Sequence, residues 1–327
     1  MGSEEKAAAL LNATFVRPAR FYLSGFSNIP HVKYYFVFLC FVYVFTVLGN
    51  GLLLSVICLA KSLHTPRYMI VFNLAVTDLC GSTALTPKLL DMFLLERRHI
   101  AYEACLSNMF FVLFFLAVQS WTLLTMAYDR CVAICFPLKY HSVVTGASIG
   151  AVLLSVWASL LGLVAFTVGV IDRLSFCGSV VVRSFFCDHA PVYKLACNDA
   201  YFSNIMAFVG FVGAIVLPLI LIVLTYVWIS VALSRIASAE ERLKALRTCT
   251  SHLIIVAIFF LPILGSNIAS VASSLHPNAR IMNSSLTHTI PALLNPIIYS
   301  LKTEEVLISI KKLYKRNRLS NFTSSKI

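Results

Sequence analysis

The stretch Met126-Ala127-Tyr128-Asp129-Arg130-Cys131-Val132-Ala133-Ile134-Cys135 ends an apolar segment that begins near Cys105. It places an acidic and a basic side chain, Asp129 and Arg130, next to each other near the end of that segment. Charges at the end of a membrane helix are costly unless they reach water or a partner, so they usually mark a functional position. The stretch therefore predicts a membrane helix with a functional acid-base pair near its end.

The composition of the chain indicates a membrane protein. Of its 327 residues, 59% are hydrophobic and only 12% are charged, whereas about 25% of residues are charged in a soluble domain. We therefore expect an all-α membrane protein, a seven-transmembrane helix bundle with a short amphipathic helix after the seventh span. An apolar helix needs roughly 20 residues to cross a bilayer, and seven stretches are long enough, at about 34–60, 68–95, 105–136, 147–171, 201–236, 248–273 and 281–301.

The spans divide the chain into an N-terminal segment (1–33), the bundle (34–301) and a final helix and tail (302–327). The N-terminal segment lacks the compact apolar core of a cleaved signal peptide. Its glycosylation sequon at Asn12 requires the extracytoplasmic side. With the N-terminus outside, 15 of the 26 Lys and Arg residues fall inside, in the direction of the positive-inside rule. We expect a multi-pass plasma-membrane protein with an extracellular N-terminus and a cytoplasmic C-terminus.

The net charge of +12 is then a feature of the membrane surface, where basic residues attract anionic lipids. No basic domain with interleaved aromatic residues supports nucleic-acid binding. We therefore expect membrane lipid as a partner, and we do not expect nucleic acid.

The stretch at 126–135 closely resembles the MAYDRYVAIC signature of vertebrate odorant receptors, a branch of the rhodopsin-like G-protein-coupled receptors. Further blocks resemble that family in order and spacing, and together they cover nearly the whole chain from Gly49 to Leu301. These blocks are Gly49-Asn50, LHTPRY at 63–68, NLAVTD at 73–78, KALRTCTSH at 244–252 and PALLNPIIYSL at 291–301. The resemblance implies an odorant receptor of olfactory cilia that activates a stimulatory, olfactory-type G protein and raises cyclic AMP, with no cofactor.

Four cysteines lie on the predicted extracellular side: Cys105, Cys177, Cys187 and Cys197. Four cysteines allow three pairings, and their spacing does not choose between them. The resemblance implies the pairs Cys105–Cys187 and Cys177–Cys197, and unpaired thiols are the alternative. None of the cysteines has the C-x-x-C spacing of a zinc or redox site, so no metal site is expected there.

The switch region combines the acid-base pair with helix 7. Pro296 cannot donate an amide hydrogen, so helix 7 should bend there. Asp78 is an isolated carboxylate near the bilayer middle and needs a proton, a polar partner or a cation; Asn50 and Asn295 are the expected neighbours. Packing between helices is the alternative role for this polar network. The residues assigned to the switch and to G-protein coupling are Asp129, Arg130, Ile134, Leu246, Cys249, Asn295, Pro296 and Tyr299.

The chain departs from the family pattern at several positions. Cys131 replaces a tyrosine, Arg67 replaces a methionine, and Phe260 stands where tyrosine is common. Gln119 replaces a glutamate in helix 3, so the region around Asp78 has one charge fewer. This substitution leaves only a weak case for a sodium ion at Asp78.

Enzyme, transporter and amine-receptor functions are the alternatives. The chain lacks the phosphate loop, H-E-x-x-H and G-x-S-x-G motifs of common enzyme classes, so no enzymatic activity is expected. A transporter or channel would more often show repeated halves and mid-span charges. An amine receptor would place an aspartate in the outer third of helix 3, but residues 108–116 contain no carboxylate. Asp188 on the following loop could partly substitute for it.

The ligand pocket is expected among helices 3, 5, 6 and 7. Helical spacing groups the candidate lining residues as Asn108, Val112, Leu113, Leu116, Ala117, Asn204, Phe208, Phe211, Phe260, Ile263, Leu264, Asn267, Ser285 and His288, with Ile281 beside the last two. Ordinary bundle packing is the alternative role for each of them. These faces contain no Arg, Lys or carboxylate, so we expect a neutral or weakly polar odorant. Its oxygen would bond Asn267 or His288, and its carbon chain would contact Phe208, Phe260, Val112 and Leu116.

Overall fold

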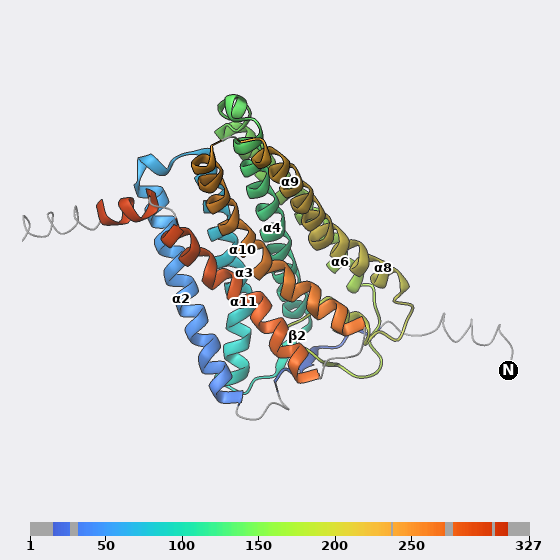
Figure 1. Cartoon of the computed structure of the whole chain (residues 1–327). Helices are drawn as coiled ribbons and strands as arrows, with labels where there is room; N and C mark the ends of the chain where they lie inside the picture. The colour runs from blue at the N-terminus through green and yellow to red at the C-terminus, as the bar shows by residue number, and fades with distance from the viewer. Residues whose placement is uncertain (1–15, 27–31, 237, 272–276, 303–304, 313–327) are drawn as a thin grey trace, which may run out of the picture.

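The computed structural model describes residues 16–26, 32–236, 238–271, 277–302 and 305–312. These residues form seven long helices that lie side by side (Figure 1). All seven predicted spans are therefore confirmed as helical. The fifth is continuous through a π-helical stretch, η3. The bounds are α2 (Val32–Leu59), α3 (Pro66–Leu94), α4 (Tyr102–Cys135), α6 (Gly146–Ile171), α8 (Tyr201–Phe211) with η3 (Val212–Val216) and α9 (Leu217–Ser234), α10 (Ala239–Val271) and α11 (Pro277–Lys302).

The short elements connect the long helices at the two ends of the bundle. Residues 305–312 are helical and follow α11, where the sequence predicts a short helix. Asn12 and its sequon, and the basic tail beyond residue 312, lie outside the described residues. The short elements are η1 (Lys61–Leu63), η2 (Pro137–Lys139), α5 (Tyr140–Val143) and α7 (His189–Tyr193), with the strands β1 (Arg20–Leu23), β2 (His99–Ala101) and β3 (Val181–Val182).

Six of the seven helices are long and apolar enough to cross a membrane by length and composition. The seventh, α11, carries the polar side chains Asn283, Ser284, Thr287 and His288 and does not meet this criterion. The outer surface of the bundle is rich in exposed apolar side chains such as Phe41, Leu154 and Trp228. In water such an apolar surface would favour aggregation, whereas in a bilayer it contacts lipid.

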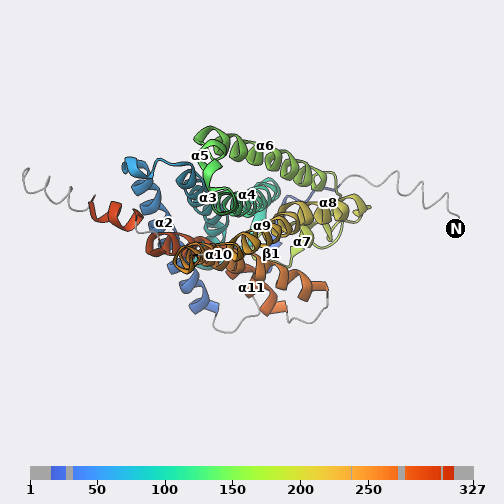
Figure 2. The ribbon, with the colours of Figure 1, turned by 45° about the horizontal axis from the view of Figure 1, so that its top comes forward.

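The helix α4 lies in the middle of the bundle, with α3, α6, α9 and α10 around it (Figure 2). Its inner position explains why many of its side chains are buried. A polar junction ties it to two neighbours: Asn73 on α3 donates to the Thr122 hydroxyl at 2.8 Å, and Trp157 on α6 donates to the Asn73 carbonyl at 2.9 Å. Such bonds fix the helices in register where lipid supplies no alternative partner.

Local sequence sets several helix boundaries and approaches. Pro66 occupies the first turn of α3, where its missing N–H costs nothing. Thr145 and Ser148 form a reciprocal capping box at the start of α6. Gly49 allows α2 and α11 to approach closely, because an added Cβ would lie 3.0 Å from the Pro296 ring. The helix α10 begins at Ala239, before the predicted start near 248, because a charged helix-forming segment extends it beyond the apolar span.

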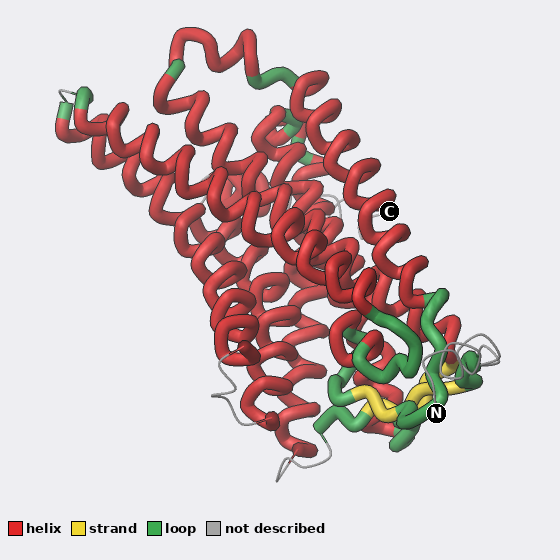
Figure 3. Tube along the Cα trace, turned by 90° about the vertical axis from the view of Figure 1, so that its right-hand side faces the viewer, coloured by secondary structure: helices red, strands yellow, loops and turns green. Residues whose placement is uncertain are grey.

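A three-stranded sheet covers one end of the bundle, which we call the disulfide end (Figure 3). The strand β1 pairs antiparallel with β2 and parallel with β3, and it buries Phe21 and Leu23. Arg17 forms ion pairs with Asp172 and Glu103. These strands join the N-terminal segment to two loops, and they were not predicted from the sequence.

Two disulfides hold the same end: Cys105–Cys187 ties the loop before α8 to α4, and Cys177–Cys197 closes that loop on itself. These are the two pairings that the family resemblance implied. The six remaining cysteines, all in described residues, are free. The opposite end of the bundle carries Arg130, and we call it the Arg130 end.

We expect the two disulfides to differ in their effect on stability, because they close loops of 82 and 20 residues. The chain-entropy model gives about 4–5 kcal/mol for the longer loop and about 3 kcal/mol for the shorter. Thermal unfolding of the purified protein should therefore show a larger loss for Cys105→Ser/Cys187→Ser than for Cys177→Ser/Cys197→Ser. Cys58→Ser, at an exposed free cysteine, is the control, and a reversed order of the two double variants would contradict the expectation.

Candidate binding cavity

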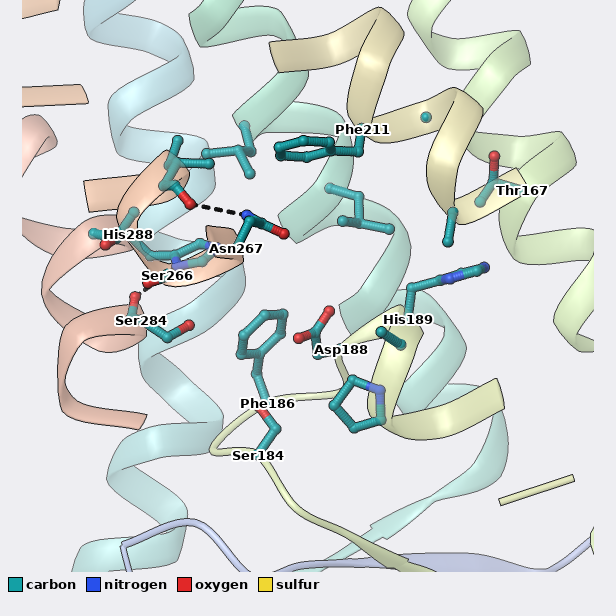
Figure 4. A pocket seen from close by; sticks show the side chains of 18 of the residues that line it. Thr167, Ser184, Phe186, Asp188, His189, Phe211, Ser266, Asn267, Ser284 and His288 are labelled. Atoms are coloured by element: carbon teal, nitrogen blue, oxygen red, sulfur yellow. Dashed lines mark hydrogen bonds between the residues drawn. The ribbon is translucent and has the colours of Figure 1, made fainter. Parts of the chain in front are cut away.

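A cavity of about 880 Å³ lies inside the bundle near the disulfide end (Figure 4). Side chains from α4, α6, α8, η3, α10 and α11 form its walls, and residues 179–195 cover it from the loop before α8. The Cys105–Cys187 disulfide holds this loop over the cavity, since it joins the loop to the start of α4. The volume is within the range of about 300–1,000 Å³ that is usual for small-molecule sites.

The structure brings together half of the pocket residues proposed from the sequence. Those that line the cavity come from α4, α8, α10 and α11, and they are Leu113, Leu116, Ala117, Phe211, Ile263, Asn267 and His288, with Ile281 beside them. Those that do not line it are Asn108, Val112, Asn204, Phe208, Phe260, Leu264 and Ser285. The cavity therefore includes residues from each of the four helices named in the prediction, but only part of each proposed face.

The excluded aromatic and apolar residues have clear positions in the structure. Phe208 is 68% exposed and faces away from the bundle, whereas Phe211 on the same helix faces the cavity. Phe260 is 1% exposed and packs in the bundle core, with Leu264 against the same core cluster. Val112 packs against Phe185, Phe186 and neighbouring residues of a separate cluster.

The excluded polar residues bind other parts of the protein instead of facing the cavity. Asn108 donates to the Ala84 carbonyl and accepts from the Cys187 amide, so it holds the loop rather than a ligand. Asn204 accepts from the Tyr193 hydroxyl at 2.9 Å. Ser285 is buried and bonded to the Tyr35 hydroxyl. Each of these side chains therefore stabilises a contact between elements.

The loop contributes cavity residues that the helical patterns could not reveal. Phe185, Phe186, Asp188 and His189 flank Cys187 and line the cavity. Their position next to a cysteine that bonds to helix 3 is the one sequence signal that could have identified them. A loop without periodicity gives no information about which side chains point inward.

Charged side chains that do not belong to the proposed helix faces also border the cavity. Arg183 and Lys194 are exposed at the loop, and Arg280 comes from the first turns of α11. Burial raises the pKa of the Asp188 carboxyl, and the nearby His288 and Arg280 act in the opposite direction. The carboxylate therefore has positive charge near it within the protein.

His189 is the most deeply buried ionisable group in the loop. Its side chain is 4% exposed, and within the described part of the chain neither ring nitrogen has a hydrogen-bond partner. Burial lowers the pKa of His189 to about 4, so the ring is neutral near pH 7. A neutral imidazole presents one N–H donor and one acceptor nitrogen.

At the Arg130 end, the partner of Asp129 comes from outside its own helix. The Asp129 carboxylate is buried and accepts from the Tyr140 hydroxyl at 2.7 Å. The ion pairs found among the described residues do not include Asp129 with Arg130. Adjacent residues of a helix point about 100° apart, which favours a partner from another element over the neighbouring side chain.

Helix α10 is held against α4 and α9 near that end. The ring of His252 on α10 bonds the Tyr226 hydroxyl through Nδ1 at 2.8 Å and the Leu123 carbonyl through Nε2 at 3.1 Å. Cys249 is buried against Ile134 in a small apolar cluster. Leu246, which was assigned to G-protein coupling together with Ile134 and Cys249, is 42% exposed.

Between the two ends, the buried carboxylate of Asp78 accepts from Gln119 at 2.8 Å and from Asn295 at 2.9 Å. The expected contact with Asn295 is confirmed. Asn50 instead donates to the Thr46 and Ala292 carbonyls. Both groups that contact Asp78 are N–H donors, one to each carboxylate oxygen. Among the described residues no three His, Cys, Asp or Glu side chains converge as a metal site.

The helix α11, which is the seventh span, contributes to the Asp78 site and to the Arg130 end. Pro291 and Pro296 lie inside α11, and Asn295 comes directly before the second proline. The Tyr299 hydroxyl contacts the Met126 sulfur at 3.1 Å. The order of Asn295, Pro296 and Tyr299 along this helix therefore places one polar group at the Asp78 site and one beside α4, a turn before Arg130.

Comparisons with known proteins agree on one family. A family model described as "Olfactory receptor" matches residues 39–317. Mouse olfactory receptor 8C8 is 34% identical over 299 residues, which cover 91% of this chain and 95% of that protein. Human olfactory receptor 8B8 is 36% identical over 315 residues, which cover 94% and 99%. The crystal structure of squid rhodopsin matches with a TM-score of 0.71 at 17% identity, over 88% of this chain and 87% of that chain.

The buried His189 should make the stability of the protein depend on pH. Because burial lowers its folded pKa from 6.5 to about 4, the stabilisation is complete above pH 6.5 and is lost as the pH falls toward 4. Between pH 7 and pH 4.5 the loss should be on the order of 2–3 kcal/mol. Thermal unfolding of His189→Gln should change less over this interval than that of the wild type.

The matched control for that experiment is His141→Gln, because His141 is exposed at the other end of the bundle. Its pH profile should follow the wild type. Parallel profiles for the wild type and His189→Gln would contradict the assignment of a buried, neutral ring.

Proposed function

The chain belongs to the olfactory receptor family, and from this premise we propose that it binds an odorant in the loop-covered cavity and activates a stimulatory, olfactory-type G protein to raise cyclic AMP. It is a rhodopsin-like receptor of the plasma membrane and not an enzyme. An odorant and a heterotrimeric G protein are the partners that membership of the family implies. Olfactory cilia are the proposed location.

The cavity beneath the loop is the observation that supports ligand binding most strongly. It combines a volume of about 880 Å³ with largely apolar walls and a few polar groups on α10, α11 and the loop. Such a combination suits a small molecule, because apolar contact supplies affinity and a few polar atoms set orientation.

We propose that the disulfide end faces outside and the Arg130 end faces the cytoplasm. Disulfides form in oxidising compartments and are rare in the cytosol, so the end with Cys105–Cys187 and Cys177–Cys197 belongs outside. An odorant would then reach the cavity from the outside, and the G protein would reach Arg130 from the inside.

The proposed odorant is neutral or weakly polar. The polar side chains Asn267 and His288 lie at the cavity wall (Figure 4), which supports a ligand with a small number of polar atoms. The apolar contacts differ from the prediction: Leu113, Leu116 and Phe211 line the cavity, whereas Phe208, Phe260 and Val112 do not. Arg183 and Lys194 are exposed and can keep their charges in water, so they do not require a charged ligand.

An amine is the second candidate ligand, and the position of Asp188 on the cavity wall favours it. A carboxylate could offset the desolvation of an ammonium group. Against this, the guanidinium of Arg280 already lies close enough to Asp188 to stabilise its charge. A cyclic-AMP assay with a primary amine and the corresponding alcohol discriminates between the two ligands.

We propose that activation releases α10 from α4 at the Arg130 end. The bonds from His252 to Tyr226 and to Leu123 and the cluster around Cys249 keep that end closed. Outward movement of α10 would open a groove with Ile134 and Cys249 on its apolar walls. A helix of the G protein could dock in such a groove, with Arg130 freed to contact it.

Arg130→Ala should abolish odorant-evoked cyclic AMP and leave surface expression intact, because the change removes a contact to the G protein rather than a packed core residue. The measurement is a cyclic-AMP reporter in transfected cells with surface staining. Arg173→Ala, an exposed arginine at the disulfide end, is the control and should signal normally. Undiminished signalling by Arg130→Ala would refute the proposed coupling site.

Phe211→Ala and Phe208→Ala are a matched pair that tests the position of the cavity. Phe211 lines the cavity and Phe208 faces away from it. Loss of a buried aromatic contact with the ligand should lower potency by about tenfold or more, so Phe211→Ala should shift the dose response to the right. Phe208→Ala should respond like the wild type, and a larger shift for Phe208→Ala would place the ligand elsewhere.

Asn267→Ala and His288→Ala should each lower potency without lowering surface expression. Loss of one hydrogen bond to the ligand costs about 1–1.5 kcal/mol, or roughly tenfold. Dose-response curves for the best agonist give the shift. Wild-type potency in both variants would mean that these side chains do not orient the odorant.

A further inference from the structure

The first observation concerns the tautomer of His288. Its Nδ1 lies 2.8 Å from the Ser284 carbonyl oxygen on the same helix. A carbonyl oxygen can only accept, so Nδ1 must carry the hydrogen of this bond. In the neutral ring the other nitrogen, Nε2, is then an acceptor. His288 lines the cavity, and it therefore offers a ligand an acceptor rather than a donor.

The same reasoning fixes the Asn267 amide. Its Nδ2 donates to the Ile263 carbonyl oxygen at 2.8 Å, and only the NH₂ group can face an acceptor. The amide oxygen is left to point into the cavity, as Figure 4 shows beside the dashed bond. Asn267 therefore also presents an acceptor to a ligand. The second N–H of its amide is on the nitrogen that faces the helix backbone.

Two threonines on the cavity wall repeat the pattern. Thr167 donates its hydroxyl hydrogen to the Leu163 carbonyl at 2.9 Å, and Thr287 donates to the Asn283 carbonyl at 2.7 Å. A hydroxyl has one hydrogen, so each oxygen can only accept from a ligand. The Asp188 carboxylate, which also lines the cavity, is an acceptor in its ionised form.

The cavity also contains donors, among them the hydroxyls of Ser184, Ser266 and Ser284 and the guanidinium of Arg280. An alcohol can accept from these groups and donate to the acceptors at the same time, whereas an ether can only accept. The Ser266 hydroxyl accepts from Asn283 and keeps its own hydrogen available. His189 has one N–H in its neutral ring, together with one unpaired acceptor nitrogen. Arg183 and Lys194 are exposed beside the loop. A group that both donates and accepts would suit His189 as well as the acceptors.

We infer that the receptor selects ligands that donate a hydrogen bond, namely alcohols and phenols, over ethers, esters and aldehydes of the same size and shape. This inference rests on the proposed function and specifies its ligand class. An ether or carbonyl oxygen has no hydrogen to offer to Nε2 of His288 or to the Asn267 oxygen, so these two acceptors would lose their water without gaining a bond from the ligand. Buried polar groups that are left unpaired are the strongest source of discrimination between similar ligands.

The test is a comparison of matched compounds on one carbon skeleton. Hexanol, octanol and phenylethanol are compared with their methyl ethers and with the corresponding aldehydes. The readouts are cyclic-AMP dose responses in transfected cells and thermal stabilisation of the purified receptor. Each alcohol should be at least about tenfold more potent than its ether and its aldehyde, which is the value of one hydrogen bond.

Two substitutions test whether the preference for alcohols depends on the proposed acceptors or on a general effect on the fold. His288→Phe and Asn267→Leu remove the proposed acceptors, and each should reduce the alcohol-to-ether potency ratio toward one. Damage to the fold would instead lower the potency of all compounds together and leave the ratio unchanged. Asn204→Leu is the control, because Asn204 bonds Tyr193 and does not line the cavity; its ratio should equal that of the wild type.

The possible outcomes distinguish the inference from the function on which it rests. Ethers or aldehydes that match or exceed the alcohols would overturn the inference and leave the odorant receptor function standing. An unchanged ratio in both His288→Phe and Asn267→Leu would overturn the assignment of the acceptors. If no compound of any series activates cells or stabilises the purified receptor, both the inference and the proposed binding of neutral odorants fail.

Discussion

The buried carboxylate of Asp78 is the interaction on which the arrangement of the bundle most depends. It lies on α3 and accepts from Gln119 on α4 and from Asn295 on α11, so one side chain connects three helices. A charge in an apolar interior is tolerated only with such partners. The same two partner helices carry Ala117 and His288 at the cavity and Arg130 and Tyr299 at the other end. The Asp78 site therefore lies between the cavity and the Arg130 end on the helices that reach both.

The two ends of the receptor have different kinds of construction. The disulfide end is fixed by covalent bonds and by a sheet that includes the N-terminal segment, which suits a cavity of defined shape. The Arg130 end is held by single hydrogen bonds such as those of His252 and by a small apolar cluster. Each such bond contributes about 1 kcal/mol, within the range that a ligand can shift. Rigidity at one end and weak closure at the other are what a ligand-driven switch requires.

The sequence was sufficient for the features that depend on the bilayer or on repeated motifs. The seven spans follow from the length of apolar stretches, and the contact of Asp78 with Asn295 follows from the cost of an isolated charge. The sequence did not reveal that Phe208 faces outward, because in a membrane helix both faces are apolar and the pattern loses its contrast. Tyr140 as the partner of Asp129 and the loop residues at the cavity depend on tertiary contacts between segments far apart along the chain.

The central claim is that a ligand in the cavity opens the Arg130 end, and the most direct test is a distance measured across that end. Spin labels at Leu246 on α10 and at His141 on α5, both exposed, report the separation of these elements in the purified receptor. With the strongest alcohol agonist and the G protein present, the distance distribution should shift to longer values than in the free receptor. An unchanged distribution, in a sample whose thermal stabilisation proves that the ligand is bound, would contradict the account.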